Sequence, residues 1–102
     1  MRKPSDCTSI EDIREEIDRI DSEVIKLLGE RFGFVKEVVK YKSKDRDSVV
    51  AKKRYDAVLE TRKKWAQQNG LDPGLIYSVY KQLLDHFISE ELKIIEEENN
   101  KK

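Results

Sequence analysis

The sequence predicts an all-α fold made of three helices, of which the first is very long. Three observations support this prediction. Apolar residues between Ile10 and Lys42 recur at alternating spacings of four and three, the period of a helix with one buried stripe. Asn69-Gly70 followed by Asp72-Pro73 places a helix stop directly before a helix start. No segment shows the alternation of a half-buried strand, and no internal repeat is present.

The first predicted helix begins at Ile10 or one residue earlier. Thr8 and Glu11 match a capping box, and Asp12 adds negative charge near the positive end of the helix dipole. No proline interrupts the helix before Lys42. Its apolar stripe consists of Ile13, Ile17, Ile20, Val24, Leu27, Phe34, Val38 and Tyr41. Position 31 falls in the same series, and it is an arginine.

This helix is too long for one small chain to cover. At about 1.5 Å per residue it measures roughly 45–50 Å, whereas a compact chain of this size has a radius of gyration of about 13 Å. We interpret residues 1–102 as a single domain, and a domain of that size buries only a modest core. We therefore expect the stripe to be covered by association with another chain.

Composition argues against several classes of partner. Charged residues make up 41% of the chain, and 21 Lys+Arg balance 21 Asp+Glu, so the chain lacks the overall positive field that nucleic-acid binding uses. No apolar span of ~18 residues and no signal peptide can be recognised. Cys7 is the only cysteine, so no intrachain disulfide can form. We expect a cytoplasmic protein without a nucleic-acid or membrane partner.

Charge is nevertheless unevenly distributed along the chain. Cations concentrate between Lys36 and Lys64, and an acidic run extends from Glu90 to Glu98. Solvated helix faces are the simplest interpretation of both segments. The alternative for the cationic segment is a local site for a small anion.

The second predicted helix runs from about Val49 to Asn69. It follows a polar segment, Ser43–Ser48, that we interpret as a solvated connection with Lys42 at its hinge. Gly70 ends the helix because glycine adopts the left-handed conformation at low cost. The inner face of this helix consists of Tyr55, Val58, Leu59, Trp65 and Ala66.

The third predicted helix starts at Pro73, with Asp72 as its N-cap. We expect it to fray into the polar tail Glu96–Lys102. Its apolar face consists of Ile76, Val79, Tyr80, Leu83, Leu84, Phe87, Ile88 and Ile95. Glu91 interrupts that face, four residues after Phe87 and four before Ile95.

Polar residues in apolar company are the candidates for chemistry, because burying them is costly unless something pairs with them. Arg31 and Lys42 are eleven residues apart, three turns along the helix and about 20° around it, so both can point inward from one face. Arg14 flanks the stripe, and Arg54 lies one turn before an inner residue of the second helix.

Each of these residues also has a structural interpretation. Arginines at such positions often form salt bridges, a lysine at a helix end often caps carbonyls, and Glu91 can pair with one of the cations. However, three or four inward cations against one inward carboxylate leave positive charge uncompensated. A dianionic ligand would balance that charge.

The chain carries no pattern for covalent or metal chemistry. There is no cysteine–histidine cluster, no serine–histidine arrangement and no glycine-rich phosphate loop. We interpret the single histidine, His86, as a partly buried packing residue. We therefore expect no metal and no cofactor, and a reaction that needs only orientation and electrostatic stabilisation of developing charge.

Several short motifs follow one another along nearly the whole chain: Pro4-x-Asp6-Cys7-Thr8, Asp12-Ile13-Arg14-Glu15-x-Ile17-Asp18-Arg19-Ile20-Asp21, Gly29-x-Arg31, Val35-Lys36, Lys42, Arg54 and Trp65-Ala66-x-x-Asn69-Gly70-Leu71-Asp72. Their order and spacing resemble the AroQ-type chorismate mutases, and the isochorismate-pyruvate lyase branch is the most similar.

The resemblance implies an intertwined helical homodimer with two equivalent, shared active sites. The substrate would be a small dicarboxylate, chorismate or isochorismate. Its carboxylates would be held by arginines, and the substrate-binding residues would be Arg14 of the partner chain with Arg31, Lys42, Arg54 and Glu91. Lys42, Glu91 and Arg31 would be catalytic, with Lys42 and Glu91 on the ether oxygen where negative charge grows.

Three positions depart from the pattern of many bacterial mutases. Ala51, Tyr55 and Phe87 stand where those enzymes carry an acidic residue, a glutamate and a serine, and the missing glutamate normally receives the ring hydroxyl of the substrate. These departures favour the lyase branch. Glu91 replaces the glutamine of the familiar lyase, and a carboxylic acid there is a known variation among mutases.

We therefore predict a chorismate mutase, which rearranges chorismate to prephenate for aromatic amino acid biosynthesis. The first alternative is an isochorismate-pyruvate lyase, which yields salicylate and pyruvate for salicylate biosynthesis, and one protein can have both activities. The second alternative is a helical dimerisation module without catalytic activity, which explains the stripe but not the inward cations.

Overall fold

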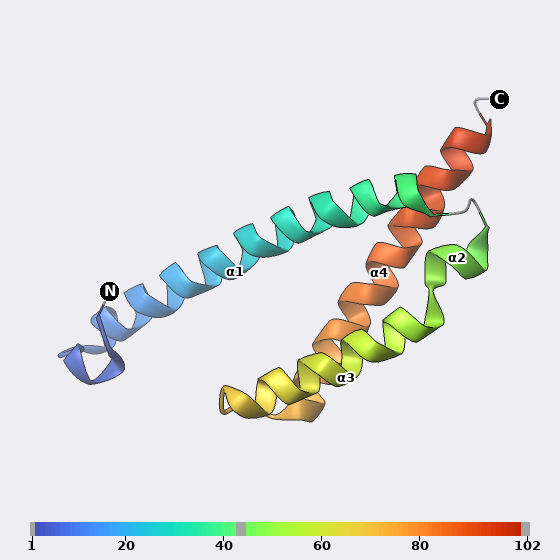
Figure 1. Ribbon diagram of the computed structural model, residues 1–102. Helices are drawn as coiled ribbons and strands as arrows, with labels where there is room; N and C mark the ends of the chain where they lie inside the picture. Colours follow the sequence, from blue (N-terminus) through green and yellow to red (C-terminus); the bar gives the residue numbers. More distant parts are fainter. Residues whose placement is uncertain (1, 43–44, 101–102) are drawn as a thin grey trace. The chain divides into compact units, whose positions relative to one another are not determined.

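The computed structural model describes residues 2–42 and 45–100, and every regular element within them is a helix (Figure 1). The predicted all-α class is therefore confirmed. The elements are a 3₁₀ turn η1 (Pro4–Asp6), α1 (Ile10–Val38), a second 3₁₀ turn η2 (Val39–Tyr41), α2 (Arg46–Val50), α3 (Lys52–Gln68) and α4 (Pro73–Asn100). Three of them, α1, α3 and α4, correspond to the predicted helices. The chain divides into two compact units, Met1–Phe34 and Val35–Lys102, which we describe separately.

Helix α1 begins at Ile10, as predicted, but its cap differs from the predicted one. The hydroxyl of Ser9 accepts the amide of Asp12 at 3.1 Å, and the carboxylate of Asp12 accepts both the amide and the hydroxyl of Thr8 at 3.0 Å. The predicted capping box of Thr8 and Glu11 is thus wrong by one residue. These hydrogen bonds from Thr8 lower the pKa of Asp12. The negative charge that they favour lies beside the positive end of the helix.

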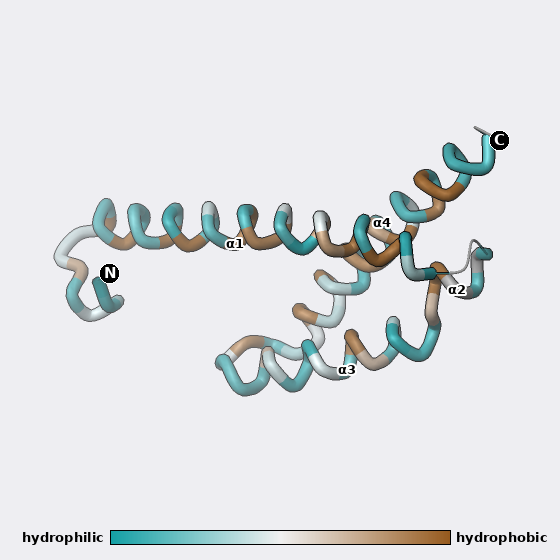
Figure 2. Tube along the Cα trace, turned by 45° about the horizontal axis from the view of Figure 1, so that its top comes forward, coloured by the Kyte–Doolittle hydropathy of each residue, from teal (hydrophilic) through white to brown (hydrophobic). Residues whose placement is uncertain are grey.

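The apolar stripe of α1 is exposed within the first unit. Figure 2 shows hydrophobic residues along one side of α1 and hydrophilic residues along the other. This unit contains only the N-terminal arm and one helix, so it holds no second helix that could pack on the stripe. Between 45% and 57% of the surface stays exposed at Ile13, Ile17, Ile20, Val24 and Leu27. A contiguous exposed apolar stripe of this kind is typical of an interaction surface.

The C-terminal end of the predicted first helix is tighter than expected. The α-helical turns stop at Val38, and η2 carries the chain to Lys42, whose amide bonds to the carbonyl of Val39 at 3.2 Å. Tight 3₁₀ turns of this kind are common at helix ends. Lys42 therefore stands where the chain leaves the helix. Of the predicted connection after it, Ser43 and Lys44 lie outside the described residues.

Helices α3 and α4 lie side by side in the second unit and form a hairpin (Figure 1). The turn between them is the predicted one: Gly70 has a φ of 74°, and the amide of Leu71 bonds back to Ala66 O at 2.8 Å. Asp72 then accepts the amide of Gly74 at 2.9 Å, which confirms it as the cap of α4. Val58, Leu59 and Ala66 of α3 are buried.

The predicted helix Val49–Asn69 is interrupted near its start. Residues 46–50 form the separate helix α2, so part of the predicted solvated connection is helical. Ala51 then has φ 47° and ψ 64°, the left-handed conformation, before α3 begins at Lys52. An L-residue in that conformation costs about 1–2 kcal/mol. Burial of Val49, which packs with Val39 and Ile95, offsets this cost.

Helix α4 is longer than predicted. It stays helical to Asn100, so the expected fraying from Glu96 is wrong, and residues 101–102 lie outside the described part. Most residues of its predicted apolar face are partly or fully buried, but Val79 is exposed. No helix in the described part of the chain is both long and apolar enough to cross a membrane.

Candidate active site

A lysine and a glutamate, far apart in sequence, meet inside the second unit. The Nζ atom of Lys42 lies 3.3 Å from Oε1 of Glu91 and donates a second hydrogen bond to the carbonyl oxygen of Val49 at 2.9 Å. The side chain of Glu91 is 5% exposed and that of Lys42 20% exposed. Two of the predicted site residues are thus brought together in a largely desolvated place.

Apolar packing positions this pair. Ile95 lies one turn after Glu91 on α4 and packs with Val39 of η2 and Val49 of α2. Val39 is three residues before Lys42, so the same cluster fixes the start of the lysine side chain. The long methylene stem of a lysine can pack along such apolar surface while its ammonium group reaches a polar partner. The pair is therefore held from both ends by one hydrophobic cluster.

Burial raises the pKa of Glu91, and the Coulombic attraction and hydrogen bond of Lys42 act in the opposite direction without cancelling it. The sequence alone left the sign of this shift open. A raised pKa makes the protonated acid, which can donate a hydrogen bond, more accessible near neutral pH. Lys42 and Glu91 together can offer an ammonium donor and a carboxylic acid donor.

The three predicted arginines lie on other elements than this pair. Arg54 lies in the first turn of α3 and is exposed in the single chain. Arg14, which is exposed, and Arg31, which is partly buried, belong to the Met1–Phe34 unit. Their place in the site stays a prediction. His86 was predicted to be partly buried, but its side chain is 65% exposed, so that prediction is wrong.

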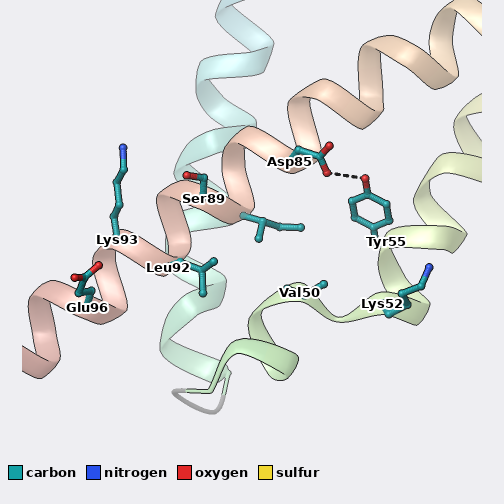
Figure 3. A pocket seen from close by; sticks show the side chains of 9 residues that line it. Val50, Lys52, Tyr55, Asp85, Ser89, Leu92, Lys93 and Glu96 are labelled. Atoms are coloured by element: carbon teal, nitrogen blue, oxygen red, sulfur yellow. Dashed lines mark hydrogen bonds between the residues drawn. The ribbon is translucent and has the colours of Figure 1, made fainter.

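Tyr55 makes a contact that the sequence analysis did not identify. Its hydroxyl donates to Oδ1 of Asp85 at 2.6 Å (Figure 3). Nζ of Lys81 donates to Oδ2 of the same carboxylate at 3.1 Å. The hydrogen bond raises the pKa of Tyr55 and lowers that of Asp85. The spacing of four residues between Lys81 and Asp85 was the sequence signal from which their ion pair could have been predicted. Tyr55, one of the three departures from the mutase pattern, thus ties α3 to α4.

An open pocket of about 600 Å³ lies between α2, α3 and α4 (Figure 3). Its lining residues are Val50, Lys52, Tyr55, Asp85, Ile88, Ser89, Leu92, Lys93 and Glu96. Three of its four charged lining residues are paired within the protein: Lys52 with Asp56, Lys93 with Glu90, and Asp85 with Tyr55. Lys42 and Glu91 are not among its lining residues, so we place the candidate active site at the Lys42–Glu91 pair instead.

The fold and the candidate site together define an all-helical protein in which two largely buried polar groups, Lys42 and Glu91, can stabilise negative charge on a ligand. Comparison with known proteins identifies the family. The sequence profile of the chorismate mutase type II family matches residues 13–92, and the chain belongs to this family. The matched residues include both Lys42 and Glu91. The resemblance stated from the sequence motifs is thereby confirmed.

Three relatives illustrate the range of this family. The chain is 38% identical over 93 residues to an isochorismate pyruvate lyase of Pseudomonas aeruginosa, with 91% of each chain covered. It is 24% identical over 90 residues to a chorismate mutase of Methanocaldococcus jannaschii, with 88% of this chain and 91% of the relative covered. Identity to the T-protein of Haemophilus influenzae is 32% over 76 residues, which are 74% of this chain but 20% of that protein.

Proposed function

We propose that this protein is a chorismate mutase, which converts chorismate to prephenate without a cofactor. The observation that carries the proposal is the buried contact between Lys42 and Glu91 in a chain of the chorismate mutase type II family. In this rearrangement the ether C–O bond breaks as a new C–C bond forms, and the enzyme transfers no proton. Negative charge grows on the ether oxygen, so fixed donors aimed at that atom lower the barrier.

Lys42 is suited to this role by its hydrogen-bonding capacity. An ammonium group has three donors. One goes to Val49 O and one to Glu91 Oε1, which leaves a third for the ether oxygen of the substrate. Because the ammonium is already held, little reorganisation is needed when charge develops.

Glu91 supplies the second donor when it is protonated. Its ionised form would place negative charge beside an oxygen that is itself becoming negative, whereas the acid donates a hydrogen bond. The raised pKa of Glu91 supports this assignment because it favours the acid. Binding of a substrate with two carboxylates requires more cations, and we assign that task to Arg31, Arg54 and the Arg14 of a second chain.

The proposed active form is an intertwined homodimer whose two sites each use both chains. The exposed stripe of α1 supports this assembly, because the first unit holds no second helix to cover it. Pairing of two such stripes would bury apolar surface at about 25 cal/mol per Å². The two units of each chain would then act as one catalytic domain.

A second candidate is isochorismate-pyruvate lyase activity. It is supported by the 38% identity to the Pseudomonas aeruginosa lyase and by Tyr55, whose hydroxyl is engaged by Asp85 and replaces the glutamate that accepts the substrate hydroxyl in many mutases. In that reaction the same C–O bond breaks, a ring hydrogen moves to the departing pyruvate fragment, and salicylate remains. Lys42 and Glu91 would stabilise the same oxygen.

Two assays on the purified protein test these proposals and the non-catalytic alternative. Loss of chorismate absorbance would establish mutase activity, and salicylate fluorescence from isochorismate would establish lyase activity. Lys42→Ala, measured in parallel, shows whether either signal comes from this protein. A folded dimer inactive on both substrates would support a dimerisation module and refute the proposed function.

A further inference from the structure

The break between α2 and α3 lies beside the candidate active site. Ala51 is left-handed, with φ 47° and ψ 64°, and it is the only non-glycine residue with a positive φ in the described part of the chain. Val49, two residues earlier, is 1% exposed, and its carbonyl oxygen accepts the hydrogen bond from Nζ of Lys42 at 2.9 Å. The strained residue and the lysine are therefore linked through one carbonyl group.

Helix geometry explains why this carbonyl is free to hold a lysine. In an uninterrupted α-helix the carbonyl of Val49 would accept the amide of Lys53, four residues on. The break at Ala51 makes Lys53 the second residue of α3, where helix amides have no intrahelical partner. A carbonyl buried away from water needs a donor, and Lys42 supplies it.

We propose that Ala51 is a positioning residue: its left-handed conformation releases the Val49 carbonyl from the helix so that this carbonyl anchors the Lys42 ammonium group for catalysis. Ala51 itself contacts no substrate in this scheme and acts through Val49 O. The proposal rests on the proposed function for its effect on turnover. Its structural part, the release of one carbonyl by one backbone conformation, stands on the described contacts alone.

A positioning role for Ala51 predicts different effects on turnover and on substrate binding. The anchored ammonium opposes charge that develops only in the transition state, so loss of the anchor lowers kcat. The arginines assigned to the substrate carboxylates do not depend on Val49 O, so KM changes little. A residue that merely stabilised the fold would instead reduce the fraction of folded protein and leave kcat per folded site unaltered.

Three substitutions at position 51 separate backbone conformation from side-chain size. Glycine and asparagine accept the left-handed conformation, whereas threonine, which is polar and similar in size to asparagine, does not because it is β-branched. We expect Ala51→Gly and Ala51→Asn to keep kcat within about threefold of wild type. Ala51→Thr should lower kcat by about tenfold or more with KM within about threefold.

Two outcomes would overturn the proposal on kinetic grounds. One is an Ala51→Thr protein, folded by circular dichroism, with wild-type kcat. The other is an Ala51→Asn protein that loses as much kcat as Ala51→Thr, since side-chain size and not backbone conformation would then be responsible. If Ala51→Thr does not fold, the comparison of Ala51→Asn and Ala51→Gly with wild type still decides, because both must retain activity.

NMR of the wild-type protein tests the structural part without any substrate. A positive φ brings the amide and α protons of one residue close together, so Ala51 should show a strong intraresidue NOE. The amide of Lys53 should exchange rapidly with solvent because it has no helical acceptor. A protected Lys53 amide would overturn the proposal, since Val49 O would then belong to the helix.

Wild-type protein inactive on both substrates would refute the proposed function instead, and the NOE and exchange data would still decide the structural part.

Discussion

At the scale of single residues, the candidate site holds a lysine and a glutamate that are expensive to bury as ions. Taking an ammonium and a carboxylate out of water costs several kcal/mol per ion, and their attraction offsets this only with good geometry and further hydrogen bonds. Lys42 meets that requirement through Val49 O and Glu91 Oε1. Removing one partner should therefore disturb the other as well as the reaction.

Lys42→Ala should lower kcat by about 100- to 1000-fold, because loss of one preorganised donor to a developing oxyanion costs about 3–4 kcal/mol of transition-state stabilisation. Lys40→Ala is a matched control, since Lys40 is exposed and pairs with Glu37 on the surface. Steady-state kinetics with circular dichroism measures both variants. Turnover of Lys42→Ala within threefold of wild type would contradict the site assignment.

The role proposed for Glu91 predicts a specific pH dependence of kcat. Its pKa is raised above the ordinary glutamate value by burial, and only the protonated acid can donate to the ether oxygen. Activity should therefore be highest below this pKa and fall as the pH rises through it. Glu91→Gln donates at every pH, so it should flatten this limb of the kcat profile and keep or increase the rate near neutrality. The assignment fails if the wild-type profile is flat, or if Glu91→Gln keeps the alkaline loss.

At the scale of secondary-structure elements, the Tyr55 hydroxyl links the start of α3 to the middle of α4: it donates to Asp85 and accepts from Nζ of Lys81. Tyr55→Phe removes the donor to Asp85 and should destabilise the protein by about 0.5–1 kcal/mol at neutral pH, since the acceptor is largely exposed. Tyr77→Phe is the control, because the contact of Tyr77 with Lys63 involves the ring and not the hydroxyl. Urea denaturation at equal protein concentration measures both.

The hydrogen bond between Tyr55 and Asp85 also predicts how the free energy of unfolding depends on pH. The pKa of Asp85 is lowered in the folded protein, so its stabilising effect is present above the unfolded-state pKa and is lost as the pH falls through the folded-state pKa. The difference in unfolding free energy between wild type and Tyr55→Phe should therefore shrink towards acid pH. A difference that is independent of pH would mean that the Tyr55 hydroxyl does not depend on the Asp85 charge.

The sequence predicted the main helices because their signals are local. Gly70 and Asp72 mark a turn by their own conformational and hydrogen-bonding preferences, and both behave as predicted. The cap of α1 was displaced because Thr8 and Ser9 are both good caps, and the carboxylate of Asp12 decided between them. The fraying of α4 from Glu96 was wrongly predicted from polarity alone, because glutamate is a good helix former.

Tertiary packing explains what the sequence did not predict. Alanine has the highest helix propensity, so nothing local at Ala51 signals a break. The left-handed residue instead follows the tertiary packing of Val49, which is buried two residues earlier. Spacing did single out the two residues that the structure brings together: Glu91 interrupts the apolar series of its helix, and Lys42 lies eleven residues after Arg31 on one helix face. Asp85 was missed because it lies off the apolar face of α4, where a carboxylate usually faces solvent.

At the scale of the whole molecule, the exposed stripe of α1 predicts an obligate dimer. Its thermal unfolding midpoint should rise with protein concentration, because association stabilises only the folded state. Ile20→Gln, in the stripe, should lower this midpoint and weaken the dimer. Ser22→Gln introduces the same side chain at an exposed polar position and should have little effect. A monomer of 12.0 kDa in light scattering at micromolar concentration would contradict the prediction.

Helix α1 precedes α3 and α4 along the chain, and this order affects how the protein is made. The ribosome releases α1 before α3 and α4, and in the proposed dimer its stripe is covered by a second chain. The α3–α4 hairpin forms from neighbouring residues within one chain, whereas pairing of the stripes is bimolecular and depends on concentration. Chains translated side by side on one messenger RNA would meet soonest. In the proposed dimer, the rate of synthesis therefore affects two quantities: the amount of protein that accumulates, and the time for which the α1 stripe stays exposed to aggregation.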